Sequence, residues 1–320
     1  MTLQNLNDTL PRGLFMKDIK QKHSFSLLGG DKRQYVLADE LIRRGHCVRL
    51  FGLGEESARL TGAEICTGIE KAIEGSRFLL LPLPMTRDNA NLSLVSEPSI
   101  GKIELAELVR LSVKHGCKGI LGGMIPQEFI RLCESNRLFV RDYYQSETLQ
   151  RKNALPSAEG ALMIAMEHTD RTVYGMKALV GGYGRIGKIL ASLLQKLGAE
   201  VIVAARREET LCEIAMDGYN AIRLGDEYDA LQKAVDKADV IFNTIPFVIF
   251  TERVLSGTKN KPLYVEIASN PGGIDLSCAR RMGIKTVFAP SLPGKYAPAS
   301  AGEYIFETIA DILSERGIHL

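Results

Sequence analysis

The stretch Ala178–Gly187, ALVGGYGRIG, decides the fold of this chain. Its apolar start runs into glycines spaced G-x-G-x-x-G, and an amphipathic run, Lys188–Leu197, follows. This order predicts a strand, a tight turn and a helix. Gly182 permits the turn, Gly184 lets the backbone approach a pyrophosphate, and Gly187 allows the helix to pack closely on the strand. The first N–H groups of the helix would then face the anion.

Three glycines at this spacing are a weak signal alone, because the chain has 30 glycines among its 320 residues. The segments that follow strengthen it. Apolar runs recur with helical stretches between them, as a doubly wound parallel sheet requires. The expected strands are Val201–Ala204, Asp239–Asn243, Leu263–Ile267 and Lys285–Phe288. The predicted cofactor-binding residues lie in the glycine turn and at the strand ends: Gly182, Tyr183, Gly184, Arg185, Ile186, Gly187, Ala205, Arg206, Arg207, Asn243, Thr244, Pro246 and Ala268.

The end of the expected strand Val201–Ala204 indicates which dinucleotide binds. NAD-binding domains carry an acidic residue there, about twenty positions past the glycines, which binds the ribose 2′-hydroxyl. This chain has Ala205, Arg206 and Arg207 instead. A guanidinium can hold the 2′-phosphate of NADP, whereas a carboxylate would repel it. NADP is therefore the predicted cofactor; the alternative is that the two arginines only solvate the end of the strand.

The first half of the chain repeats the pattern. Phe25–Gly30 is an expected strand that ends in glycines, and a helical segment, Gln34–Arg44, and a strand, Cys47–Phe51, follow it. Here the glycine pair runs into Asp31, whose carboxylate would occupy the place of a phosphate at the helix N-terminus. Only the second half is therefore predicted to bind the dinucleotide. Further strands are expected at Arg77–Leu81, Gly119–Leu121 and Leu138–Val140, and further helices at Ile103–Lys114 and Pro126–Glu134.

These patterns predict an α/β protein with two Rossmann-like doubly wound domains and a cleft between them, as in the two-domain build of 2-hydroxyacid dehydrogenases. The expected division is a substrate or partner domain over residues 1–150, an NADP-binding domain over 151–301, and a C-terminal helix over 302–320 that packs back on the first domain. Residues 1–22 are expected to form a polar extension. A helix over Ser157–His168, beginning after Pro156, is expected to cross between the domains.

Composition excludes several classes of partner. With 40 basic and 38 acidic residues the formal net charge is +2, and no basic block indicates nucleic-acid binding. No apolar segment reaches the length of a membrane span, and the N-terminus lacks the apolar core of a signal peptide. The six cysteines lie far apart without metal-ligand spacing, so buried reduced thiols in the cytoplasm and no metal site are expected.

Ligands of open α/β sheets bind beyond the carboxyl ends of the strands, so residues there are the candidates for a substrate site. Arg33 could clamp a carboxylate across the cleft, while Asp31 either orients that arginine or only caps the helix. Lys295 could pair with a carboxylate, transfer a proton if desolvation lowered its pKa, or be an ordinary solvated lysine. The predicted catalytic residues are Lys295, Asn270 and Ser157, of which Ser157 could be only a helix N-cap, and the predicted substrate-binding residues are Arg33, Asp31, Asn153, Ser291 and Ser300.

None of the five histidines follows a strand of the second half, so no catalytic histidine is assigned. This argues against the usual 2-hydroxyacid dehydrogenase mechanism, in which a positioned base takes the alcohol proton during hydride transfer. A different redox substrate is expected.

Six segments, taken together, resemble the A-subunit family of dipicolinate synthase. They span almost the whole chain: LLGGDKRQ (27–34), LLLPLP (79–84), NALPSAEGA (153–161), GGYGRIGK (181–188), EIASNPGGID (266–275) and SLPGKYAPASAGE (291–303). The PGGID segment and the LPGKYAPASAG loop are far more specific to that family than the glycine turn. Ser157 and Ser300 stand where the family usually has threonine, a change that keeps the hydroxyl.

The resemblance implies oxidation of a dihydrodipicolinate-type ring to dipicolinate (pyridine-2,6-dicarboxylate), with NADP as hydride acceptor and the flavoprotein B chain of dipicolinate synthase as partner. It implies the mother-cell cytoplasm of a sporulating bacterium as the setting, and leaves a homo-oligomer open. A diacid substrate agrees with the expected cations Arg33 and Lys295 on the cleft. Two other interpretations stay open: another two-domain hydroxyacid or amino-acid dehydrogenase, and a non-catalytic nucleotide-binding scaffold.

Overall fold

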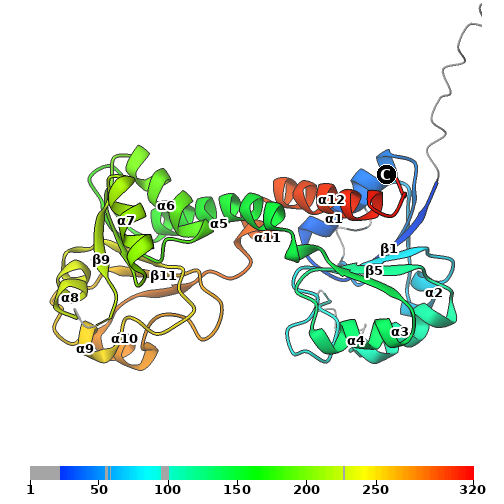
Figure 1. The fold of residues 1–320 in the computed structure, drawn as a ribbon, viewed down its shortest axis with the longest axis horizontal. Helices are drawn as coiled ribbons and strands as arrows, with labels where there is room; N and C mark the ends of the chain where they lie inside the picture. The colour runs from blue at the N-terminus through cyan, green and yellow to red at the C-terminus, as the bar shows by residue number, and fades with distance from the viewer. Residues whose placement is uncertain (1–21, 55–56, 58, 95–100, 226–227) are drawn as a thin grey trace, which may run out of the picture.

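In the computed structural model the chain forms two α/β domains, each built on a parallel six-stranded sheet (Figure 1). The structure describes residues 22–54, 57, 59–94, 101–225 and 228–320. All but the last residue of the expected polar extension therefore lies outside the described residues. The predicted fold class, two Rossmann-like doubly wound domains, is confirmed.

The first sheet has the strand order β3-β2-β1-β4-β5-β6. Its strands are β1 (Ser24–Leu28), β2 (Cys47–Phe51), β3 (Ala63–Ile65), β4 (Phe78–Leu80), β5 (Gly119–Gly122) and β6 (Phe139–Asp142). The order reverses between β1 and β4, which is where ligands bind in sheets of this kind.

The second sheet repeats this topology as β12-β11-β10-β7-β8-β9, so its reversal lies between β7 and β10. Its strands are β7 (Lys177–Gly181), β8 (Glu200–Ala205), β9 (Asn220–Arg223), β10 (Val240–Asn243), β11 (Leu263–Glu266) and β12 (Thr286–Phe288). Sequence analysis did not name β3 and β9. Both are short, and most of their residues are exposed, so neither has the apolar run of a buried strand.

Helices cover both faces of each sheet, which is why the central strands are apolar on both faces. In β1, Leu27 packs in one hydrophobic cluster and Leu28 in another, since successive side chains point to opposite faces. The helices of the first domain are α1 (Lys32–Arg43), α2 (Ile69–Ile73), α3 (Leu105–Lys114) and α4 (Gln127–Ser135). Those of the second are α6 (Arg185–Lys196), α7 (Glu208–Met216), α8 (Tyr228–Lys237), α9 (Glu252–Leu255), α10 (Leu276–Met282) and α11 (Leu292–Tyr296).

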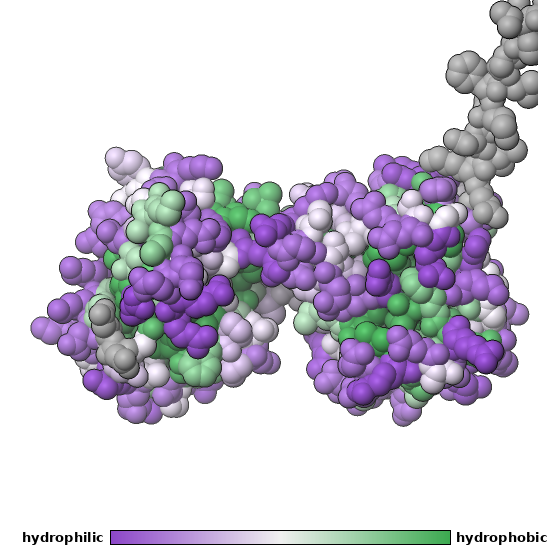
Figure 2. Space-filling model, viewed as in Figure 1, coloured by the Kyte–Doolittle hydropathy of each residue, from purple (hydrophilic) through white to green (hydrophobic). Residues whose placement is uncertain are grey.

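Two long helices join the domains along one side of the molecule: α5 (Glu147–His168), which follows a short 3-10 turn η2 (Tyr143–Gln145), and α12 (Pro298–Ser314). The chain crosses to the second domain along α5 and returns through α11 to α12, which packs on α1 and α5 (Figure 1). Figure 2 shows a deep hollow between the two domains on the side away from these helices. The carboxyl end of β1 meets α11 where the two domains join, because Gly294 of α11 lies against Asp31.

The start of α5 differs from the prediction. The helix begins at Glu147, not at Ser157, and Pro156 lies inside it. Its N-cap is Ser146, whose hydroxyl accepts a hydrogen bond from Leu149 N–H, so an N-cap role for Ser157 was wrong. Ser157 instead donates to the Asn153 carbonyl at 2.9 Å, one turn earlier. Likewise, α12 begins at Pro298, before the expected start of the C-terminal helix.

The glycine turn of the first domain is closed by its own chain. Gly30 N–H donates to the Ser93 carbonyl at 3.1 Å, and a Cβ on Gly29 would lie 2.3 Å from that same oxygen. Asp31 caps α1 by accepting from Arg33 N–H. A backbone oxygen and a carboxylate therefore occupy the region where the second domain has an open turn.

All six cysteines are free, but the expectation that all are buried was wrong, because Cys47 and Cys212 are exposed. Burial raises the pKa of the Cys117 thiol to about 11 and that of Cys133 to about 12. Across the described ranges, no helix combines the length and apolar character needed to cross a membrane. Within the same ranges, no three His, Cys, Asp or Glu side chains are grouped to hold a metal ion.

Candidate functional site

The glycine turn of the second domain has the geometry of a phosphate cradle. Gly182 has φ +97°, and a Cβ on Gly187 would lie 2.2 Å from the Gly182 carbonyl oxygen, so both positions exclude a side chain. Nothing lies within 4 Å of the point where a Cβ on Gly184 would stand. Gly184 is the N-cap of α6 and supplies no side-chain cap. The turn thus offers open space in front of the N–H groups of a 12-residue helix.

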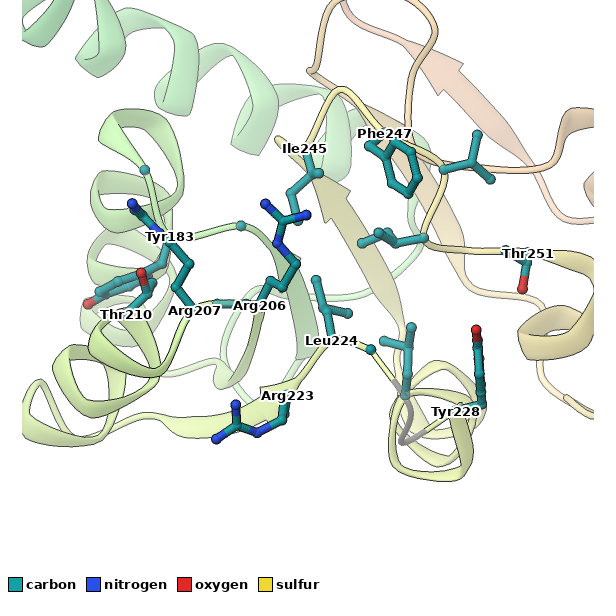
Figure 3. Close-up of a pocket in the computed structure, with 17 residues that line it drawn as sticks. Tyr183, Arg206, Arg207, Thr210, Arg223, Leu224, Tyr228, Ile245, Phe247 and Thr251 are labelled. Atoms are coloured by element: carbon teal, nitrogen blue, oxygen red, sulfur yellow. The ribbon is translucent and has the colours of Figure 1, made fainter.

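A cavity of about 490 Å³ opens beside this turn (Figure 3). It is formed by the glycine turn, the ends of β8 and β9, and the loop after β10. Its lining comprises Gly182, Tyr183, Gly184, Ala205, Arg206, Arg207, Thr210, Arg223, Leu224, Gly225, Tyr228, Leu231, Ile245, Phe247, Val248, Ile249 and Thr251. An apolar floor with polar groups at one end suits an adenosine moiety that carries a phosphate.

Arg206 and Arg207 project from the end of β8 at the mouth of this cavity. In Figure 3 the Arg206 side chain extends toward Ile245, and Arg207 lies beside Tyr183. Neither arginine forms an ion pair with any of the residues that the structure describes. Arg223, at the end of the neighbouring β9, differs because it pairs with Glu208 of α7. The cavity therefore carries two exposed guanidinium groups at the predicted position of the 2′-phosphate.

Other predicted cofactor residues shape the site without presenting polar atoms to it. Asn243 is fully buried; its amide nitrogen donates to the Ile245 carbonyl and to Glu266 Oε1, both at 2.8 Å, and its Oδ1 accepts from Ile245 N–H. The Thr244 hydroxyl donates to the Gly181 carbonyl at 2.8 Å. These bonds fix the turn after β10. Pro246 is exposed, and Ala268 is half-buried just beyond β11.

Glu266 holds this region together through its hydrogen bonds, and the sequence did not predict a role for it. It ends β11 and is 2% exposed. Its carboxylate accepts from Asn243 Nδ2 at 2.8 Å, Tyr264 OH at 3.0 Å, and the backbone N–H groups of Ala268 at 3.1 Å and Gly273 at 2.7 Å. This buried carboxyl group thereby ties the end of β10 to the loop after β11. The only signal in the sequence was a carboxylate at the end of an apolar strand.

Glu266→Ala is expected to destabilise the second domain by about 3 kcal/mol or more, because it leaves several buried donors without their charged acceptor. Chemical denaturation of the purified chain measures the effect. Glu200→Ala, at the exposed start of β8, is the matched control and is expected to change the unfolding free energy little. Equal stability of the two variants would show that Glu266 does not organise these loops.

A second cavity of about 240 Å³ adjoins the glycine turn on the side of α5. It brings together two residues predicted for substrate chemistry, Asn153 and Ser157, with the start of α6. Its lining is Tyr144, Gln150, Asn153, Ala154, Ser157, Gly184, Arg185, Ile186 and Thr244. Asn153 is 8% exposed, and its Oδ1 is buried without a hydrogen-bond partner among the described residues. Asn153 thus lines this cavity beside the glycine turn with an acceptor that no described group satisfies.

Arg33 does not stand free at the cleft, so its predicted role as a carboxylate clamp does not fit the structure. Its Nε and Nη2 donate to the two carboxylate oxygens of Asp31 at 2.8 and 2.7 Å, and Nη2 also donates to the Leu83 carbonyl. The guanidinium is buried, and α11 covers it, since a Cβ on Gly294 would lie 3.0 Å from Arg33 Nε. Asp31 both caps α1 and orients Arg33.

Lys295 lies exposed on α11, with its ammonium 4.8 Å from the centroid of the Tyr296 ring. Hydrogen bonding to the Tyr296 side chain raises the Lys295 pKa, so proton transfer through a lowered pKa was wrong. Its ammonium stays charged and can still attract a carboxylate. Ser291 is exposed with φ +56°, Ser300 is half-buried in the first turn of α12, and Asn270 is exposed in the loop after β11.

Comparison with known proteins agrees with this geometry along most of the chain. Residues 24–144 match the family model of the N-terminal domain of the dipicolinate synthase A chain. The A chain of dipicolinate synthase from Bacillus subtilis (strain 168) is 29% identical over 290 residues, which cover 91% of this chain and 95% of that protein. The chain is similar to the dipicolinate synthase A chain. The predicted resemblance is confirmed.

Solved structures give the same result. The crystal structure of the dipicolinate synthase A chain from Bacillus subtilis matches with a TM-score of 0.76 at 29% identity, over 92% of this chain and 97% of that one. The corresponding chain of dipicolinate synthase from Bacillus halodurans matches with a TM-score of 0.78 at 26% identity, over 92% and 98%. Phosphoglycerate oxidoreductase from Vibrio cholerae, at 17% identity and a TM-score of 0.55, shares the fold alone.

The second domain has its own match. Residues 138–259 fit the family model of the D-isomer specific 2-hydroxyacid dehydrogenase, NAD binding domain. This domain is therefore a nicotinamide dinucleotide-binding domain of the dehydrogenase type, and the protein has an oxidoreductase-type role.

Proposed function

We propose that this protein is an NADP-dependent oxidoreductase that converts a dihydrodipicolinate-type ring to dipicolinate. Two exposed arginines, Arg206 and Arg207, support NADP as the cofactor. They lie at the end of β8 beside an open glycine turn. The name of its relatives, dipicolinate synthase, carries the choice of product.

The residues of the second domain fit the dinucleotide in three places. The N–H groups at the start of α6 take the pyrophosphate over the open space at Gly184. Arg206 and Arg207 take the 2′-phosphate with charge-assisted hydrogen bonds. The third place is the second cavity, on the α5 side of the glycine turn, which is lined by Asn153 with its unpaired Oδ1. When bound, the oxidised nicotinamide supplies the hydride acceptor.

The substrate side needs orientation more than acid–base chemistry. A dihydropyridine dicarboxylate that loses a hydride to the cofactor and a proton to solvent becomes an aromatic pyridine dicarboxylate, so developing aromaticity assists both losses. Ser157 lines the cavity next to Asn153, Lys295 is exposed on α11, and Asn270 is exposed in the loop after β11. These side chains would hold the ring against the nicotinamide, and positioning supplies most of the rate enhancement.

The proposal includes a second protein chain. The relatives are named as one lettered component of a synthase, which implies an assembly with another component. We propose that this other component is the flavoprotein B chain of dipicolinate synthase and that it completes the substrate pocket, since NADP already accepts both electrons of the oxidation. The proposed setting is the mother-cell cytoplasm of a sporulating bacterium.

The test supplies the reconstituted complex of this chain and the flavoprotein with freshly generated dihydrodipicolinate and NADP, and follows dipicolinate by ultraviolet absorbance and chromatography. We expect product well above the spontaneous background, and NADPH formed in step with it. Each of the two proteins by itself is a control. A complex that binds NADP but yields only background product would favour another two-domain dehydrogenase or a nucleotide-binding scaffold.

A further inference from the structure

A substrate that carries carboxylates calls for a cation on the first domain's side of the cleft. Arg33 does not supply it, because the guanidinium is buried and bonded to Asp31 and Leu83. Two other arginines, at the end of β6 and at the start of α5, also form ion pairs: Arg141 with Glu315 and Arg151 with Glu147. The segment between β4 and α3 lies at the same edge of the sheet and carries another arginine, Arg87.

Residues 85–93 of this segment form a small hairpin on the carboxyl edge of the first sheet. Ser93 N–H donates to the Met85 carbonyl at 2.8 Å, and Thr86 and Leu92 form an antiparallel bridge. The base of the hairpin is tied to the strand ends on both sides: Met85 N–H donates to the carbonyl of Gly123, beyond β5, and Gly30 N–H, beyond β1, donates to the Ser93 carbonyl. The hairpin thus stands at the reversal of strand order between β1 and β4, where ligands of such sheets bind.

The tip of this hairpin is held rigidly by Asp88. Its Oδ1 accepts from the N–H groups of Ala90 at 3.0 Å and Asn91 at 2.7 Å and from the Thr86 hydroxyl at 3.2 Å, and its Oδ2 accepts from Asn91 Nδ2 at 2.7 Å. The hydrogen bonds from Asn91 and Ala90 hold the Asp88 pKa well below its usual range. The turn is therefore preformed at physiological pH, and the hydrogen bonds of the Asp88 carboxylate are made within the turn.

Arg87 occupies this tip and is exposed. It forms no ion pair with any residue in the described ranges, in contrast to Arg33, Arg141 and Arg151. A guanidinium on a turn whose backbone is already fixed can bind a carboxylate through two parallel hydrogen bonds.

We infer that Arg87 is the substrate-binding cation of the first domain and pairs with a carboxylate of the acid held in the cleft. The inference rests on the proposed function, because it takes the ligand to be a pyridine dicarboxylate. It assigns to the 85–93 hairpin the role predicted for Arg33, and it leaves the Asp31–Arg33 pair packed between α1 and Gly294 of α11.

The experiment measures binding of dipicolinate to the full-length chain loaded with NADP, by titration calorimetry. Arg87→Ala is expected to weaken dipicolinate binding at least about tenfold, the usual consequence of losing a charged hydrogen bond, and to leave the affinity for NADP unchanged. Arg87→Lys is expected to recover part of the loss, since it restores the charge without the planar fork. Arg59→Ala is the matched control, because Arg59 is exposed beyond β2 and forms no ion pair with the described residues.

The outcomes separate the inference from the proposed function. If the wild type binds dipicolinate and Arg87→Ala binds it as tightly as Arg59→Ala does, the inference is wrong and the proposed function stands. If the wild type neither binds nor forms dipicolinate, the proposed function fails and the inference fails with it. Equal losses of NADP and dipicolinate affinity in Arg87→Ala would also overturn the inference, because they would indicate a general structural effect.

Discussion

Arg206→Asp is expected to weaken NADPH binding about 100-fold while leaving NADH binding unchanged or slightly tighter. The substitution removes a charge-assisted contact worth about 1.5–3 kcal/mol and places a carboxylate where the 2′-phosphate would lie. Each 1.4 kcal/mol corresponds to about tenfold in affinity. Arg206 lies at a strand end outside the core, so the fold should persist. Fluorescence titration with both reduced dinucleotides measures the effect.

Arg280→Asp is the control for the change of charge, because Arg280 is exposed on α10, away from the cavity. It is expected to alter neither affinity. Wild-type selectivity in Arg206→Asp would mean that the arginines at the end of β8 only solvate the strand. A parallel loss of NADH affinity would mean that Arg206 acts on a part of the cofactor that both dinucleotides share.

The second and third glycines of the turn, Gly184 and Gly187, should respond differently to replacement by alanine. Gly187→Ala places a Cβ 2.2 Å from the Gly182 carbonyl oxygen and 3.0 Å from its carbon, both backbone atoms that can move only by deforming the turn. We expect a loss of unfolding free energy of about 3 kcal/mol or more, and a fall in Tm of about 6 °C or more for a domain of this size. Thermal unfolding measures this.

Gly184→Ala meets no atom within 4 Å, and its φ of −85° suits any residue. Stability should therefore change by no more than about 1 kcal/mol, the difference between glycine and alanine at an N-cap. The methyl group would instead fill the space through which the pyrophosphate approaches the helix, so NADPH binding should fall about 100-fold or more. A Gly184→Ala protein that binds NADPH like the wild type would show that this turn does not hold the dinucleotide.

Local pattern alone predicted the central strands of both sheets and the position of the dinucleotide turn. The strands β1, β2, β7, β8, β10 and β11 are apolar on both faces because helices cover them, and such runs stand out in a sequence. The glycines of the turn are equally visible, because only glycine tolerates the φ of Gly182 and the backbone contact at Gly187. Arg206 and Arg207 could be placed because they directly follow one of these strands.

Tertiary structure alone decided which charged groups remain available. Whether Arg33 is free depends on Asp31, on the Leu83 carbonyl and on the closeness of Gly294, and two of these partners come from distant parts of the chain. Glu266 is buried because donors from the end of β10 and from the loop after β11 converge on it. Pro156 predicted a helix start, since proline lacks an N–H and breaks helices, yet α5 runs through it with most of its surroundings buried against α6, α11 and α12. The spacing of apolar residues predicts whether a segment is a helix or a strand. The pairing and burial of a side chain depend instead on residues that only folding brings beside it.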